Sequence, residues 1–72
     1  MTRELGHRIR EARRAAGFTN AESLAVALGV GMSTVQRWET GKNSPSVKSL
    51  IAIAQLTEKP VSFFLTENEV VT

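Results

Sequence analysis

The apolar residues of this chain recur mainly at spacings of three and four, which is the period of an amphipathic α-helix. The first apolar stripe consists of Leu5, Ile9, Ala12 and Ala16. It predicts a helix over residues 3–16, with Thr2 as the N-cap and Gly17 as the residue after the last turn. The arginines at positions 8, 10 and 14 lie off this stripe, so we expect them to be exposed.

A second helix begins near residue 20. Residues 19–22 read Thr-Asn-Ala-Glu, which is the Thr-x-x-Glu pattern of a capping box. Asn20 is an alternative cap, and the helix would then start one residue later. The residues expected to face the core are Leu24, Ala25 and Leu28.

A Gly-Val-Gly break over residues 29–31 separates this segment from a third helix over residues 32–40. The caps of that helix are weak, so burial of Val35 and Trp38 must hold it in place. For Trp38 we favour core packing over stacking on a base. Two short amphipathic helices joined by a tight glycine-containing turn predict a helix-turn-helix.

The C-terminal third begins with a loop rich in turn-forming residues. A fourth helix follows, capped by Ser46 or by Ser44 with Pro45 at its first position. Its buried residues are expected to be Leu50, Ile51, Ile53 and Ala54, with Val47 as a further candidate. Pro60 ends this region, and residues 61–65 are expected to form a fifth short helix.

No strand-like alternation and no repeat occur, so the fold class predicted is all-α, a compact bundle of five helices. The expected organisation is one domain over residues 1–66 followed by a short flexible tail over residues 67–72.

The net charge is only +2, but the charges are unevenly distributed. Residues 1–48 carry eight Lys/Arg and four Glu, whereas residues 49–72 carry one Lys and three Glu. This asymmetry suits a nucleic-acid-facing side, although ordinary surface charge would produce it equally well.

Composition argues against several other functions. The chain has no cysteine, no signal-peptide-like apolar run and no segment of membrane-spanning length, so we expect a cytoplasmic protein. His7 is the only histidine and lacks neighbours at ligand spacing, so we expect no metal site. No nucleophile–base set, carboxylate pair or phosphate-binding glycine loop is present. We therefore expect neither catalysis nor a cofactor.

Four polar residues of the third helix face outward in this scheme: Ser33, Thr34, Gln36 and Arg37. Such side chains hydrogen-bond base edges or phosphates, which indicates sequence-specific binding of double-stranded DNA. Ser33 and Thr34 could equally stabilise the start of the helix. Arg37 is best suited to a guanine, because its guanidinium can donate two hydrogen bonds to one base.

Several separate signals fall in a familiar order along the chain. These are Ile9-Arg10-Glu11-Ala12-Arg13, Gly17, Leu24-Ala25, Gly29-Val30, Ser33-Thr34-Val35, Trp38-Glu39-Thr40-Gly41-Lys42 and Pro45-Ser46. Together they resemble the lambda repressor-like, Cro/C1-type (XRE-like) helix-turn-helix family over residues 4–65. This resemblance implies a five-helix bundle whose third helix enters the major groove. Members are mostly phage repressors, antitoxin-type regulators and small bacterial transcription factors.

The resemblance also implies roles for individual residues. Base-reading positions match Met32, Ser33, Gln36 and Arg37. Phosphate-contacting positions match Asn20 or Ala21, Thr34, and the loop of Lys42, Asn43 and Ser44. Arg13 and Glu39 match a pair that forms a partly buried ion pair in several members.

The chain departs from the family pattern in three ways. The segment from Gly17 to Leu24 is one residue longer than usual, and the start of the second helix lacks the common Gln. Met32 stands where Gln, Arg or Ser is commoner, so it is better suited to a thymine methyl group than to a bidentate hydrogen bond.

The functional prediction is a transcriptional regulator, most simply a repressor of the phage Cro or immunity-repressor kind. We expect two copies on an inverted-repeat operator, with the free protein monomeric or weakly dimeric. The expected pairing surface is Phe63, Phe64, Leu65, Val70 and Val71. The alternative is a protein-interaction module, such as an antitoxin that neutralises a partner protein.

Overall fold

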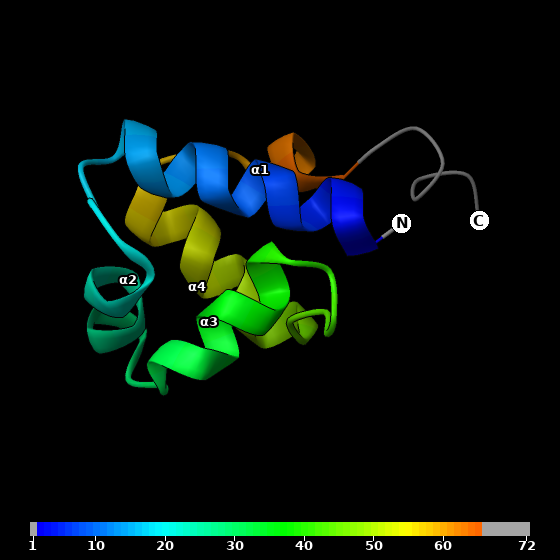
Figure 1. The fold of residues 1–72 in the computed structure, drawn as a ribbon. Coiled ribbons are helices and arrows are strands. Elements are labelled where there is room, and N and C mark those ends of the chain that lie inside the picture. The colour runs from blue at the N-terminus through cyan, green and yellow to red at the C-terminus, as the bar shows by residue number, and fades with distance from the viewer. Residues whose placement is uncertain (1, 66–72) are drawn as a thin grey trace.

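The computed structural model describes residues 2–65, and side chains from residue 4 onward. Within this part of the chain there are four α-helices, a terminal 3₁₀ turn and no strand. The elements are α1 (Thr2–Ala15), α2 (Ala21–Leu28), α3 (Met32–Glu39), α4 (Val47–Thr57) and η1 (Val61–Phe64). Helix α1 packs directly against α3, α3 packs against α2, and α4 packs against α1 and α2. In the view of Figure 1, α1 runs along the top of the bundle and the α2–α3 pair lies below it.

The all-α prediction is therefore confirmed. The prediction of a fifth helix over residues 61–65 is wrong, because residues 61–64 form a single 3₁₀ turn. Its hydrogen bonds join residues three apart, from Phe63 N to Pro60 O at 2.9 Å and from Leu65 N to Ser62 O at 3.2 Å. Four residues are too few for the longer-range bonds of an α-helix. The predicted tail, residues 67–72, lies outside the described residues.

Both ends of α1 differ by one residue from the prediction. Thr2 is already helical and is therefore not the N-cap. At the other end Gly17 has φ +94°, and the amides of Gly17 and Phe18 donate to the carbonyls of Arg14 and Arg13. These hydrogen bonds and the left-handed glycine end the helix at the place that the sequence predicts.

The start of α2 decides between the two caps that the sequence left open. Asn20 is the cap: its Oδ1 accepts a hydrogen bond from Ser23 N at 2.8 Å, and Ser23 Oγ accepts one from Asn20 N at 3.4 Å. The capping box is thus Asn-x-x-Ser, and the Thr-x-x-Glu box is wrong. Thr19 instead precedes the cap and lies in the loop between α1 and α2.

Packing of one face of each helix builds the core. It consists of Leu5, Ile9, Ala12, Leu24, Ala25, Val35, Trp38, Leu50, Ile53, Ala54 and Phe64. As expected, α3 has no side-chain cap, since Gly31 is its N-cap, and burial of Val35 and Trp38 fixes it.

Three residues predicted to be buried are exposed. Ala16 lies beyond the last residue of α1, where the helical stripe no longer continues. Val47 and Ile51 are 74% and 42% exposed. Helix α4 buries Leu50, Ile53 and Ala54, as predicted, together with Thr57, because it contacts α1 and α2 with a single face.

The arginine at position 8 is half-buried rather than solvated. Its Nη1 donates to the carbonyl of Phe63 at 3.2 Å, and its guanidinium lies 5.7 Å from the centre of the Phe63 ring. Lys59 Nζ lies 5.0 Å from the same centre, and Phe63 packs edge-on against the fully buried Phe64. These contacts attach η1 to α1.

No helix in the described part of the chain has the length and apolar character needed to cross a membrane.

Candidate nucleic-acid interface

Helix α3 has two chemically different faces. Val35 and Trp38 are buried beneath it, whereas Ser33, Gln36 and Arg37 are exposed on the opposite side. Because a helix repeats every 3.6 residues, burial of residues 35 and 38 leaves residues 33, 36 and 37 as a contiguous polar face.

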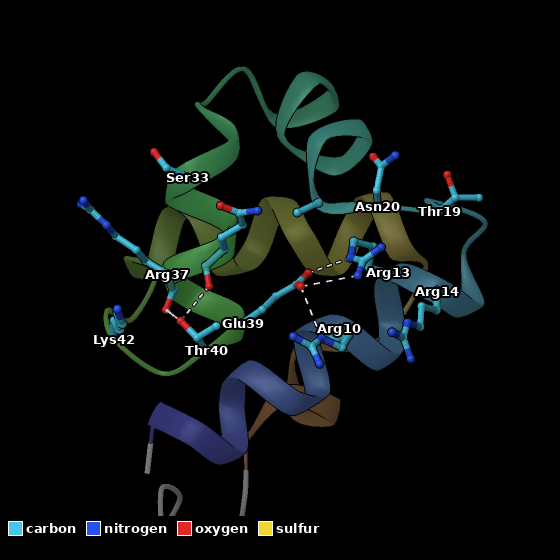
Figure 2. Close-up of a pocket in the computed structure, with 12 residues that line it drawn as sticks. Arg10, Arg13, Arg14, Thr19, Asn20, Ser33, Arg37, Glu39, Thr40 and Lys42 are labelled. Carbon is cyan, nitrogen blue, oxygen red and sulfur yellow. Dashed lines mark hydrogen bonds and ion pairs between the residues drawn. The ribbon is translucent and has the colours of Figure 1, made fainter.

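This polar face forms one wall of a groove whose other walls come from α1 and from the start of α2 (Figure 2). The residues that line the groove are Arg10, Arg13, Arg14, Thr19, Asn20, Ala21, Ser33, Gln36, Arg37, Glu39, Thr40 and Lys42. Five of these residues are cationic and one is anionic. The lining therefore carries four net positive charges, although the whole chain carries only two.

Glu39 is the carboxylate of the groove, and Arg13 neutralises it. Arg13 Nε donates to Glu39 Oε2 at 2.7 Å and Arg13 Nη2 to Oε1 at 3.5 Å. Arg13 Nη1 also donates to the carbonyl of Phe18 at 2.9 Å. Arg13 and Glu39 are 5% and 9% exposed, so this pair joins α1 to α3 away from solvent.

Arg10 contacts the same carboxylate more loosely. Its Nε lies 3.5 Å from Glu39 Oε1, and 41% of its side chain is exposed. The sequence predicts an exposed Arg10, whereas the structure has it half-buried against Glu39.

The end of α3 positions Lys42 at the rim of the groove. Gly41 has φ +83°, its amide donates to Trp38 O at 3.2 Å, and the amide of Lys42 donates to Arg37 O at 2.9 Å. A glycine adopts this left-handed conformation without steric cost, so the chain turns sharply here. The turn brings Lys42 back beside Arg37.

The groove brings together most of the residues singled out from the sequence: Arg13, Asn20, Ala21, Ser33, Gln36, Arg37, Glu39 and Lys42. Four others lie outside its lining: Met32, Thr34, Asn43 and Ser44. Met32 is nevertheless 45% exposed at the first residue of α3. Ala21 offers no side-chain donor, whereas the side chains of Thr19 and Asn20, which line the groove beside it, each carry one.

Sequence reasoning missed Arg10 and Arg14 as part of this surface. The signal was present, because positions 10, 13 and 14 are three and four residues apart and share one face of a helix. Once Arg13 is paired with α3, its neighbours on that face must border the same groove.

Comparison with known proteins agrees with this geometry. Residues 9–64 match a protein family described as helix-turn-helix, a match that covers well over half of the chain. The chain belongs to this helix-turn-helix family, of the Cro/C1 type. Membership of the family makes the domain a DNA-binding module of transcription regulation rather than an enzyme.

A relative of this helix-turn-helix domain occurs in Rhodospirillum rubrum, where it is named an uncharacterized transcriptional regulator in the ATPase CF(0) region. The two sequences are 34% identical over 65 residues, which cover 90% of this chain and 59% of the relative. The chain thus spans about three fifths of the relative's length. No solved structure matches the chain.

Proposed function

We propose that this domain binds a specific operator in double-stranded DNA and regulates transcription, acting as a repressor. Helix α3 enters the major groove, and Ser33, Gln36 and Arg37 read base edges from its exposed face. The single observation that carries the proposal is the position of this polar face in a groove with four net positive charges.

The remaining contacts divide by chemistry. Met32, exposed at the start of α3, supplies an apolar contact suited to a thymine methyl group. Side-chain donors at the edges of the interface bind phosphates of the DNA backbone rather than bases. The residues proposed for these phosphate contacts are Asn20, Thr34, Lys42, Asn43 and Ser44.

A buried ion pair supports the positioning of the base-reading face. Glu39 is held by Arg13 from α1, and α3 is only eight residues long. A helix this short is not stable alone, so its orientation depends on such tertiary contacts. The pair therefore fixes the direction in which Ser33 and Arg37 point.

The test begins with selection of bound sequences from random double-stranded DNA. Arg37→Ala is then compared with the unsubstituted protein on the selected operator and on random DNA. We expect a loss of about 1–3 kcal/mol that is confined to the operator. Lys59→Ala, which removes a cation next to η1, serves as the control and should bind both DNAs as before. If Arg37→Ala weakens binding to the operator and to random DNA equally, Arg37 contacts only a phosphate. If the selection enriches no sequence, the proposed function is rejected.

A further inference from the structure

Met32 is an exposed methionine at the end of α3 where the proposed DNA interface begins. It is the first residue of α3, it is 45% exposed, and it is not part of the hydrophobic core. The space beside it is open, because a Cβ added at Gly31 would meet nothing closer than Thr34 Oγ1, at 4.0 Å, apart from its chain neighbours. The chain has no cysteine, so Met32 carries the only sulfur within residues 2–65. Its thioether is therefore accessible to solvent in the free protein.

We infer that Met32 is a reversible oxidation site that controls operator binding, with a hydroperoxide as the oxidant. The inference rests on the proposed function, in which this side chain contacts a thymine methyl group. The site is particular to this chain, because Met32 stands where the family pattern more often has Gln, Arg or Ser.

The reaction adds one oxygen atom to the thioether. A lone pair of Met32 Sδ attacks the hydroxyl oxygen of the hydroperoxide, so that an S–O bond forms and the O–O bond breaks. The proton of the attacked oxygen passes to the departing oxygen, which leaves as water or as an alcohol. The sulfur loses two electrons and the peroxide gains them. Methionine sulfoxide reductases reverse the change, because their thiols supply two electrons and the oxygen leaves as water.

Oxidation changes the chemistry of the surface that faces the base. A thioether is apolar, whereas a sulfoxide is polar and carries a hydrogen-bond acceptor. Against a thymine methyl group this acceptor loses its water and meets no donor, so the contact becomes unfavourable. Phosphate contacts are made by other side chains and do not depend on the sulfur. We therefore expect the loss of affinity to be confined to the operator.

The fold does not depend on the state of this sulfur. Val35 and Trp38, which hold α3 against the rest of the domain, are 0% and 6% exposed. The N-cap of α3 is Gly31, which makes no side-chain hydrogen bond, so a change at Met32 removes no cap. Oxidation should accordingly leave the melting temperature unchanged while it weakens operator binding.

The first experiment measures affinity for the selected operator and for random DNA before and after treatment with hydrogen peroxide. Burial of one methyl group is worth about fourfold in affinity, so oxidation should weaken operator binding by at least about fourfold. Binding to random DNA should not change. Subsequent treatment with the two methionine sulfoxide reductases, one for each sulfoxide epimer, should restore the affinity.

Two variants serve as matched controls. Met32→Leu keeps an apolar side chain of similar volume without the sulfur, so peroxide should not change its affinity for either DNA. This variant retains Met1 and therefore also controls for oxidation there. Met32→Gln places a polar amide at the same position, and it should show the loss on the operator without any peroxide.

Mass spectrometry locates the added oxygen. Cleavage by trypsin after Arg14 and Arg37 releases residues 15–37 as one peptide, in which Met32 is the only sulfur-containing residue. This peptide should gain one oxygen atom in the free protein, and it should gain it more slowly when the operator is bound, because the base then covers the thioether. Oxidation at an equal rate in both states would place Met32 outside the interface and would overturn the inference.

Two further results would also overturn it. One is a protein oxidised at Met32 that binds the operator as tightly as the untreated protein, and the other is an equal loss of affinity in peroxide-treated Met32→Leu. In each case the proposed function would still stand if Arg37→Ala lost operator discrimination. A selection that enriches no sequence would reject the proposed function itself, and the inference with it.

Discussion

Arg13 of α1 and Glu39 of α3 meet through two hydrogen bonds, at 2.7 and 3.5 Å, although they are 26 residues apart in the sequence. Both side chains are almost completely buried. The pair connects a helix outside the helix-turn-helix to the last residue of α3. Stability and the orientation of the base-reading face therefore depend on the same contact.

Removing one partner of this pair should be costly. Glu39→Gln leaves the buried Arg13 without a counter-charge, so we expect a loss of about 3 kcal/mol in the free energy of unfolding. Urea denaturation monitored by circular dichroism measures it. Replacing both residues by apolar ones, as in Arg13→Met with Glu39→Leu, should cost less than the single change. A melting temperature for Glu39→Gln equal to that of the unsubstituted protein would contradict a stabilising role for the pair.

Gly6 should not tolerate a larger residue. An added Cβ would lie 2.6 Å from the carbonyl oxygen of Glu39 and closer still to that of Trp38. Both neighbours are backbone atoms, so α1 and α3 would have to move apart. We expect Gly6→Ala to lower the free energy of unfolding by about 1–3 kcal/mol. His7→Ala, an exposed change at the next position of α1, is the control and should stay within about 0.5 kcal/mol.

Alanine substitutions at Asn20 and Thr19 should have very different effects on stability, although both residues precede α2. Asn20 makes the capping hydrogen bond to Ser23 N, so Asn20→Ala should cost about 1 kcal/mol. Thr19 is exposed and makes no capping bond, so Thr19→Ala should leave the unfolding midpoint nearly unchanged. Equal effects of the two substitutions would argue against Asn20 as the cap.

Glu58 adopts the left-handed conformation, with φ 57° and ψ 40°, as the residue that ends α4. A residue with a Cβ is disfavoured there, whereas glycine is not. We expect Glu58→Gly to raise the free energy of unfolding by about 1 kcal/mol, seen as a higher urea midpoint at unchanged slope. Gln55→Gly, inside the same helix, should instead lower it by about 1 kcal/mol. A loss of stability in both variants would contradict strain at Glu58.

Two copies should bind one full operator. A single α3 reads only a few base pairs, and two half-sites about 34 Å apart double the sequence that is read. Of the pairing surface predicted from the sequence, Phe64 is fully buried and is not available for pairing, and Phe63 and Leu65 are partly buried. Val70 and Val71 lie outside the described residues. Light scattering of the complex should give two chains per duplex. A one-to-one complex on the selected full-length site would reject the two-copy arrangement.

Local chemistry is the part of this protein that the sequence specified well. Helical periodicity located α1 and α3 to within one residue at each end, and it placed α2 and α4 in the correct parts of the chain, because each helix has one apolar stripe bounded by a cap, a glycine or a turn. The outward face of α3 followed from the same periodicity, since residues 33, 36 and 37 lie opposite residues 35 and 38. The spacing of apolar residues within one helix does not depend on which helices pack together, so it can be read from the sequence alone.

The tertiary structure decided every question that depended on which surfaces meet. Whether Val47 and Ile51 are buried depended on the single face that α4 presents to α1 and α2. The choice of Asn20 over Thr19 depended on which of the two takes the extended backbone of a cap, and Asn20 does, with φ −146° and ψ 172°. The groove itself depended on the packing of α1 against α3, which brings Arg10 and Arg14 beside Arg37 and Lys42. Side-chain period fixes a face within one helix, but only the relative placement of helices determines which faces form a common surface.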